Sequence, residues 1–495
     1  MENAQSGPGT SLVASPPPRR SRLLRRVLLA TAVIGAAGAA AFGGLLMLRP
    51  SPPPPVRSAP PAPGPKPQVL TTVTAGVPAA LPGLTALIGE RKRYVQAHPQ
   101  DARAWAVLGT AYVERGRRTA DATNYPKAEQ ALKTSLRLRG EQSAENAAAL
   151  DGLAALANAR RNYADAKDWG EQARELAPKQ WTTYPLLIDA YTGLGDYQAA
   201  RDTLDKLMAL HTGADGRPAV MAQAAAVYRD RGWREDAAAQ LADAAAAAGT
   251  PAERAAYLQR AGQLAWERGD REDALRHFEA AVRLDPDQRA ALAGQGRALA
   301  ALGRTTEAVT AYKRALSQQS SAQYVLELGE LYQSLRMDRQ AREQYGLLAA
   351  QVGQDTAGGV DDELVIGQFE ADHGDPQAAV DRLRAEWERQ PGIEVADALG
   401  WALRRAGDPE GALRYAKIAT DKTKGGGVRS ALYSFHRGMI ERELDEDASA
   451  RRHLQDALLI NPYFSPLRAP EAKAALADLG DPPDEAAPDD VTGLQ

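Results

Sequence analysis

The sequence predicts an all-α fold, an α-solenoid of about ten helical hairpins that follows a single transmembrane helix. One pattern of small and large residues returns about every 34 residues, and it is clearest in the stretches that begin at Leu258 and Leu292. The shared positions are Gly262, Gly269 and Phe278 in the first stretch and Gly296, Gly303 and Tyr312 in the second. A helical hairpin of this size cannot bury its apolar face alone, so neighbouring hairpins must stack.

Composition excludes several classes of function. The chain has 495 residues, of which 44% are hydrophobic and 25% charged, as expected of a folded protein. The net charge of -3 provides no overall positive field that would recruit nucleic acid. The absence of cysteine excludes disulfides, thiolate nucleophiles and Cys-ligated zinc.

Residues 27–48 form an uncharged apolar run that is long enough to cross a bilayer as a helix. Five arginines precede the run, so the positive-inside rule puts the N-terminus in the cytoplasm. We therefore expect a single-pass plasma-membrane protein whose repeats lie outside the cytoplasm. The alternative is a cleaved secretory signal, for which Ala39-Ala40-Ala41 would supply the small residues of a cleavage site.

Other segments differ from the repeats in composition. We expect residues 1–26 to be a disordered basic cytoplasmic tail and residues 481–495 to be a disordered acidic tail. Residues 49–83 are predicted to be a Pro-rich linker, because ten of the twenty residues from Arg49 to Gln68 are proline and favour an extended chain. The solenoid is assigned to residues 84–480.

Local signals define the helices within each hairpin. Trp105, Leu108, Gly109 and Tyr112 have spacings that put them on one helical face. Glycine followed by aspartate marks the turn between the two helices, where glycine supplies a left-handed cap and aspartate caps the next helix. These turns are Gly195-Asp196, Gly269-Asp270, Gly374-Asp375 and Gly407-Asp408, and the second helices end near Pro178, Pro286, Pro391 and Pro462.

With these motifs, the chain from about Leu84 to Leu479 resembles tetratricopeptide repeat proteins, and the apolar N-terminal run resembles the anchor of bacterial membrane-bound members. The resemblance implies a right-handed superhelix that binds partners on its concave face. Residues 84–97 and 471–479 are expected to be capping helices. The pattern departs from the family at an insertion around residues 118–124, and at Ser434 and Arg437, where apolar residues are expected.

No catalytic or metal-binding constellation is found in the sequence, so we expect neither an enzyme nor a cofactor. The six histidines form no H-E-x-x-H pair, and neither a nucleophile elbow nor a dinucleotide fingerprint occurs. The run Gly425-Gly426-Gly427 lacks the spacing of a phosphate-binding loop and is interpreted as a flexible joint.

The concave face is the predicted partner-binding surface. Its candidate residues follow from the helical positions that the family turns toward the groove: Asp189, Arg229, Gln259, Gln263, Trp266, Arg297, Glu330, Gln333, Trp401 and Arg404. Trp266 and Trp401 are the expected anchors, because tryptophan and arginine dominate interface energetics. The alternative is that both tryptophans fill gaps between neighbouring helices.

The sequence therefore predicts a membrane-tethered, non-catalytic scaffold that binds a protein or an extended peptide segment, with no nucleic acid and no evident small-molecule substrate. By analogy with the family, an assembly factor for a secretion, cell-envelope or cytochrome-maturation complex is an alternative. A docking subunit of a cell-wall-processing enzyme complex is another.

Overall fold

The computed structural model describes residues 69–70, 72–73, 76–139, 143–317, 321–421 and 427–480. The predicted cytoplasmic tail, transmembrane helix and acidic tail (residues 1–26, 27–48 and 481–495) lie outside these ranges, as do Gly425 and Gly426. No helix in the described part of the chain combines the length and apolar character needed to cross a bilayer. The description that follows concerns the unit from Pro63 to Gln495.

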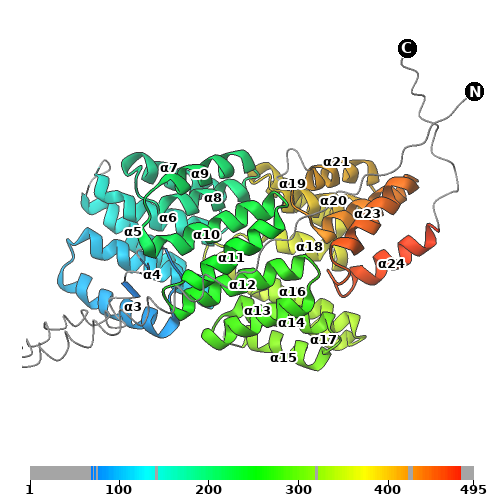
Figure 1. Cartoon of the computed structure of the whole chain (residues 1–495), viewed down its shortest axis with the longest axis horizontal. Coiled ribbons are helices and arrows are strands. Elements are labelled where there is room, and N and C mark those ends of the chain that lie inside the picture. Colours follow the sequence, from blue (N-terminus) through cyan, green and yellow to red (C-terminus); the bar gives the residue numbers. More distant parts are fainter. Residues whose placement is uncertain are drawn as a thin grey trace, which may run out of the picture. The chain divides into compact units, whose positions relative to one another are not determined.

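Within the described ranges the regular secondary structure is helical, and after α3 (Leu81–Ala97) the helices follow one another as hairpins (Figure 1). The hairpins are α4 (Ala102–Thr119) with α5 (Asn124–Arg139), α6 (Ala147–Ala159) with α7 (Tyr163–Leu176), α8 (Thr183–Gly193) with α9 (Tyr197–Ala209), α10 (Gly213–Asp230) with α11 (Arg234–Ala247), α12 (Pro251–Glu267) with α13 (Arg271–Leu284), α14 (Arg289–Ala301) with α15 (Thr305–Leu316), α16 (Ala322–Ser334) with α17 (Asp338–Ala357), α18 (Glu363–His373) with α19 (Pro376–Arg389), α20 (Ile393–Arg405) with α21 (Pro409–Thr420), and α22 (Ala431–Glu443) with α23 (Asp447–Ile460). A final helix, α24 (Arg468–Asp478), closes the series.

Both parts of the predicted turn chemistry are confirmed at two of the four glycine–aspartate turns, whereas the Asp270 side chain forms no cap. Gly195 and Gly407 have φ of 72° and 85°, the left-handed conformation that glycine adopts without steric cost. The Asp196 side chain accepts a hydrogen bond from Ala199 N at 2.9 Å, and the Asp408 side chain accepts one from Gly411 N at 2.8 Å. Gly374 is different: its φ of -128° and ψ of -136° are not left-handed, so α18 ends without the expected cap.

Close approach between helices depends on glycines that face large residues. Phe278 of α13 is fully buried and lies against Gly262 of α12 and Gly294 of α14. A Cβ at Gly262 would lie 2.7 Å from the Phe278 ring, and one at Gly294 would lie 2.4 Å from it. The recurring small residue therefore makes room for an aromatic wedge, whose removal would cost roughly 3–5 kcal/mol.

The tenth hairpin forms despite the polar residues that interrupt its pattern. Arg437 donates to Glu441 at 2.8 Å and to the Thr420 hydroxyl at 2.8 Å. His453 Nδ1 lies 2.5 Å from the other oxygen of Glu441, whose side chain is buried. Around Arg437 a hydrogen-bonded charge network thus accompanies the apolar core of this hairpin and compensates for burying Glu441.

Contacts between residues almost 200 positions apart show that the hairpins wind into closely stacked superhelical turns. Arg160, in the turn between α6 and α7, donates to Gly358 O at 2.9 Å and accepts from Asp361 N at 2.9 Å. Asn461 donates to Trp266 O at 2.7 Å across a separation of 195 residues. At about 34 residues per hairpin, one superhelical turn contains roughly six hairpins.

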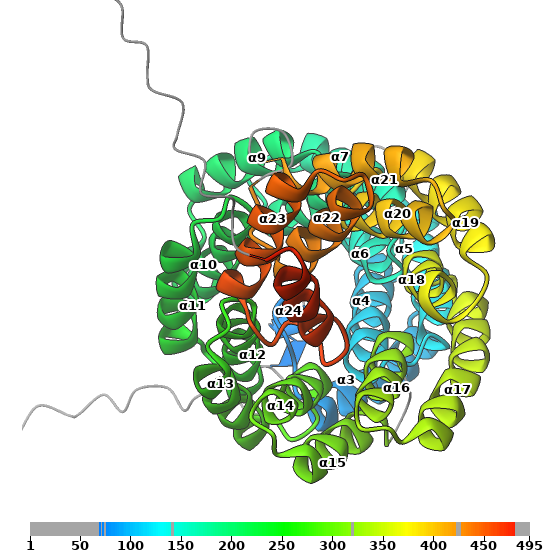
Figure 2. The same cartoon turned by 90° about the vertical axis from the view of Figure 1, so that its right-hand side faces the viewer.

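These contacts follow one rule, which we call the seam: the turn inside one hairpin meets the connector that follows the hairpin five places later. Gly195 faces Pro391 O, Gly232 faces Gly427 O, and Gly269 faces the backbone of Asn461. Seen along the superhelix axis in Figure 2, the hairpins form a ring, with α24 toward its middle. The first helix of each hairpin lies on the inside of this ring, around a lumen.

The folded unit begins earlier than the predicted linker boundary at residue 83. Val73, Val77 and Ala79 are buried in the same core as Leu84, and α3 starts at Leu81. The terminal helix also starts earlier than predicted, at Arg468 instead of Glu471. Both capping helices are present, as expected from the sequence.

The seam predicts that an alanine substitution destabilises the protein to different extents at Gly195 and at Gly303, although both glycines have the same left-handed turn conformation. Gly195→Ala places a Cβ 2.4 Å from Pro391 O, whereas Gly303, with φ of 75°, has no atom within 4 Å of its Cβ position. Gly303→Ala should cost about 1–2 kcal/mol from its left-handed backbone alone. Gly195→Ala should cost about 1–3 kcal/mol more, because the next turn must move. Urea unfolding of both variants measures the difference, and equal losses would show that the seam does not bear on stability.

Candidate functional site

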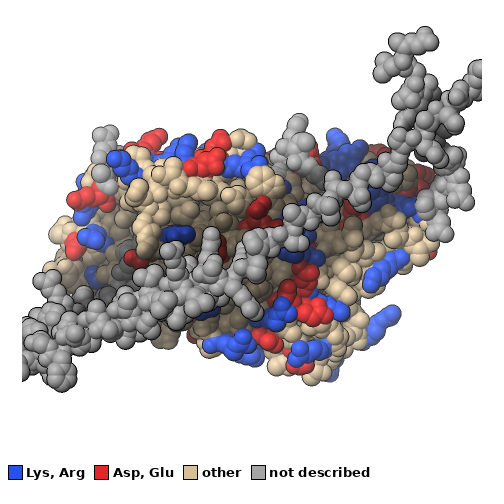
Figure 3. All heavy atoms as spheres, viewed as in Figure 1, with Lys and Arg blue, Asp and Glu red and all other residues tan. Residues whose placement is uncertain are grey.

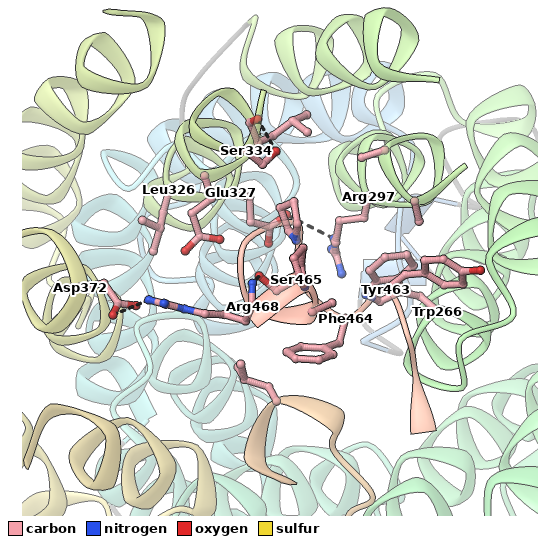
Figure 4. A pocket seen from close by; sticks show the side chains of 18 of the residues that line it. Trp266, Arg297, Leu326, Glu327, Ser334, Asp372, Tyr463, Phe464, Ser465 and Arg468 are labelled. Atoms are coloured by element: carbon pink, nitrogen blue, oxygen red, sulfur yellow. Dashed lines mark hydrogen bonds and ion pairs between the residues drawn. The ribbon is translucent and has the colours of Figure 1, made fainter. Parts of the chain in front are cut away.

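The lumen contains a cavity of about 530 Å³, which we call the lumenal cavity. Its wall consists mainly of inner helices from six consecutive hairpins, from α12 to α22, together with the segment that leads into α24 (Figure 4). This volume lies within the usual range for binding pockets. Residues that line it include Trp266, Arg297, Leu326, Glu327, Glu330, Asp372, Trp401, His436, Phe464 and Arg468.

A ladder of polar side chains joins successive inner helices. Arg229 forms two bonds with Glu267, at 2.7 and 2.9 Å, and Gln263 donates to the same carboxylate at 3.0 Å. Arg297 donates to Gln263 at 2.6 Å, and its Nε lies 3.3 Å from Glu327. Burial raises the pKa of Glu267, but Arg229 outweighs this effect and holds the pKa below its ordinary value.

Trp401 is a packed part of the wall, with an exposed fraction of 3%. Its ring stacks on His436 with 4.2 Å between centroids, and its Nε1 donates to Asp372 at 2.9 Å. His436 in turn lies 2.9 Å from Asp397. These contacts match the alternative stated above, in which the tryptophan fills a gap between helices while one edge borders the cavity.

The chain itself enters the lumen between α23 and α24. Asn461 holds this segment to Trp266 O, and the Phe464 ring lies 5.6 Å from the Phe435 ring. Arg468 follows and forms an ion pair with Asp372 at 2.5 Å, as Figure 4 shows. An irregular stretch of backbone with aromatic and basic side chains therefore lies in the cavity wall.

Glu330 differs from the other charged residues of the wall. It forms no hydrogen bond or ion pair with the described residues, although it is partly buried. Burial, followed by repulsion from Asp372 and Glu327, raises its pKa to about 8. Near neutral pH this carboxyl group is largely protonated, and it can donate a hydrogen bond into the cavity.

The ten residues predicted for the concave face are distributed over three environments. Trp266, Arg297, Glu330 and Trp401 line the lumenal cavity, whereas Gln259 lines a second cavity. The others are bonded to neighbouring residues: Arg229 and Gln263 belong to the ladder, Asp189 accepts from Gln223 at 2.8 Å, Gln333 accepts from Tyr345 at 2.8 Å, and Arg404 pairs with Glu443 at 2.9 Å. Their role in binding a partner stays a prediction.

Sequence reasoning missed several residues of the cavity. Glu327 lies three residues before Glu330, and Asp372 four residues after Gln368, so helical spacing alone could have placed both on the inner face. No sequence pattern indicates that Phe464 and Arg468 lie in the cavity wall. Their position depends on the closure of the superhelix around the C-terminal segment.

The arrangement favours binding. Among the described residues, no three His, Cys, Asp or Glu side chains gather as a metal site. His436 has an acidic partner, but Trp401 covers its ring and its exposed fraction is 7%. A ligand in the lumenal cavity would contact ion-paired side chains, the edges of aromatic rings and backbone groups.

The raised pKa of Glu330 predicts a pH-dependent stability. In the folded protein the pKa of Glu330 is about 8, above its ordinary value of 4.5. The protonated carboxyl therefore contributes fully to the free energy of unfolding below pH 4.5, and this contribution is lost as the pH rises through about 8. Glu330→Gln should remove this loss, so the variant should exceed the wild type by on the order of 2 kcal/mol at pH 9, allowing for solvent screening. Urea unfolding from pH 5 to pH 9 measures both curves.

Two comparisons isolate Glu330 in this experiment. Asp230 and Asp355, whose pKa values are raised by burial to about 6 and about 7, titrate in both proteins and cancel in the difference. Glu343→Gln, on the exposed side of α17, should follow the wild-type curve. Parallel curves for Glu330→Gln and wild type would mean that Glu330 is solvated like an ordinary carboxylate.

Solved structures with a similar arrangement include a human IFIT1 dimer with PPP-AAAA, which is 18% identical, covers 64% of this chain and 72% of that chain, and has a TM-score of 0.43. Pseudomonas aeruginosa pilF is 21% identical over 42% of this chain and 92% of that chain, with a TM-score of 0.33. A tetratricopeptide repeat protein from Parabacteroides merdae is 16% identical over 54% of this chain and 99% of that chain, with a TM-score of 0.32. None of the curated proteins matches the sequence.

The sequence model of the tetratricopeptide repeat matches residues 259–324 and residues 398–466. These two stretches contain hairpins in which a glycine faces a large buried residue, such as Gly262 with Phe278 and Gly438 with Leu454. Hairpins of the same construction extend from α4 to α23. The chain therefore contains tetratricopeptide repeats.

Proposed function

We propose that this protein is a membrane-tethered, non-catalytic scaffold that holds an extended segment of a protein partner in the lumenal cavity. Tetratricopeptide repeats support a role in protein interaction. The finer statement, that the partner enters as an extended peptide, follows from the shape and chemistry of the cavity.

One observation carries the proposal: the chain places its own irregular segment, from Asn461 to Leu467, in the wall of the cavity. The Asn461 side chain of this segment donates to Trp266 O, and the Phe464 ring contacts the Phe435 ring. An extended peptide would likewise present spaced polar and aromatic side chains. The inner helices thus already accommodate a peptide of this kind.

The other residues that line the lumenal cavity determine which groups of a partner can bind there. Leu326, Leu331 and Leu335 give apolar surface on α16 and its C-terminal end, and Gln323 and Gln368 give amides that can pair with a peptide backbone. Most charges in the wall are already paired, as in Arg468 with Asp372. Affinity would therefore come from apolar side chains and backbone hydrogen bonds more than from net charge.

The tether rests on the sequence. Residues 27–48 are uncharged and long enough to span a bilayer, and the arginines that precede them favour a cytoplasmic N-terminus. The prolines between residues 49 and 68 favour an extended spacer that would hold the repeats away from the membrane.

Blocking the cavity should abolish peptide binding. Random peptides displayed on phage are selected on the full-length protein, and the enriched peptides are then titrated against variants. Ser334→Trp places a large ring in the cavity from the end of α16 and should weaken these peptides at least tenfold. Lys313→Trp, on the outer helix α15, is the matched control and should leave affinity unchanged. If both variants bind the selected peptides like the wild type, the lumen is not the binding site.

The topology is tested separately on intact cells that express the full chain with a C-terminal epitope. External protease should remove the epitope signal from the wild type, because the repeats would lie outside the cytoplasm. A variant lacking residues 27–48 should stay protected inside the cell. Protection of the wild type as well would reverse the proposed orientation.

A further inference from the structure

A second cavity, of about 480 Å³, lies where the first superhelical turn meets the next, and we call it the arginine cavity. It shares no lining residue with the lumenal cavity. Its wall comes from the first two hairpins, from α12, α14 and α16, and from the end of α17. Five arginines from distant parts of the chain line it: Arg117, Arg118, Arg161, Arg260 and Arg289.

Three of these arginines have acidic neighbours. Arg118 pairs with Asp285, Arg161 pairs with Asp362, and Arg117 Nη1 lies 3.6 Å from Glu114. Besides Glu114, Asp355 is the acid that lines the cavity. Burial raises the pKa of both, that of Asp355 to about 7. Five arginines therefore line the cavity with two acids whose charged forms burial disfavours.

Arg118 shows most directly that the cavity can take a ligand. Its exposed fraction is 8%, and only Nη2 has an acceptor, the carboxylate of Asp285. Nε and Nη1 are buried and have no hydrogen-bond partner among the described residues. Leaving two donors of a buried guanidinium unsatisfied is costly. The two lie on different edges of the group, because each bidentate edge includes Nη2, so one oxyanion can satisfy one of them.

The other lining residues favour a small polar ligand over a peptide. Apart from Val360, the aliphatic side chains are alanines and one proline, so no pocket exists for a large apolar anchor. Tyr125, Tyr324 and Ser321 bring hydroxyl groups, and Gln259 and Gln288 bring amides. Such a lining can surround an anion with hydrogen-bond donors.

We propose that the arginine cavity binds a small oxyanion with at least two negative charges, in which phosphate or carboxylate groups pair with Arg118 and Arg260. Because Arg118 belongs to the first hairpin and Arg260 to the fifth, the bound anion would join distant hairpins and stabilise the folded array. The insertion around residues 118–124 borders this cavity, since Arg118, Ala120 and Ala122 line it.

The test uses the full-length protein in a phosphate-free buffer, with pyrophosphate as the probe in isothermal titration calorimetry. Citrate serves as the carboxylate arm, and sodium chloride at matched ionic strength controls for screening. We expect saturable binding of pyrophosphate or citrate and none of chloride. The tighter of the two identifies the ligand as phosphate-like or carboxylate-like.

Variants then assign the binding to the cavity. Arg260→Gln removes an exposed arginine that forms no hydrogen bond or ion pair with the described residues, so the fold should be unaffected while affinity falls about tenfold. Arg118→Gln should have at least the same effect, and if it does not fold, Arg260→Gln decides alone. Arg276→Gln, on the exposed side of α13, is the matched control and should bind within twofold of the wild type. Equal affinities for Arg260→Gln and Arg276→Gln, or a response to pyrophosphate and citrate no larger than to chloride, would overturn the proposal.

Discussion

The seam between superhelical turns is the constraint on which the rest of the structure depends. A single helical hairpin leaves an apolar face open, and stacking against its neighbours closes that face but still leaves a lumen open along one side. Contacts such as Arg160 with Gly358 O and Asn461 with Trp266 O connect one turn to the next. The groove thereby becomes an interior, in which charges are desolvated and pKa values shift. Both cavities exist because of this closure.

Local structure could be predicted from the sequence because its causes lie within a few residues. Each hairpin contains sequence patterns that indicate its structure: a glycine at the left-handed turn, an aspartate cap, and an aromatic residue that faces a glycine, as at Gly195 and Phe278. No such sequence pattern indicates the seam. It results from a small rotation repeated over about six hairpins, and no spacing pattern relates Arg160 to Gly358. The positions of Phe464 and Arg468 depend on the same accumulated rotation, so they could not be predicted either.

For the predicted inner-face residues, helical periodicity predicts on which face a side chain lies but not whether that side chain is free to bind a partner. Gln263 and Arg297 do lie on the inner helices, but they are bonded to each other, and Arg229 is bonded to Glu267. Periodicity gives the direction in which a side chain points, whereas its availability depends on the neighbouring hairpin. Trp401 is the clearest case. It lies on the predicted face, yet His436 and Arg468 cover it.

On the outer face shown in Figure 3, basic and acidic side chains of the described residues are interspersed, whereas the two interior cavities differ sharply in charge. In the lumenal cavity Asp372 and Glu327 are matched by arginines, and the unmatched group is a carboxyl, Glu330. In the arginine cavity Asp285 pairs with Arg118, and the donors without a partner among the described residues belong to the same arginine. A cavity with an unpaired carboxyl group and a cavity with unpaired arginine donors can select different ligands, because a buried polar group without a partner costs more free energy than a solvated one.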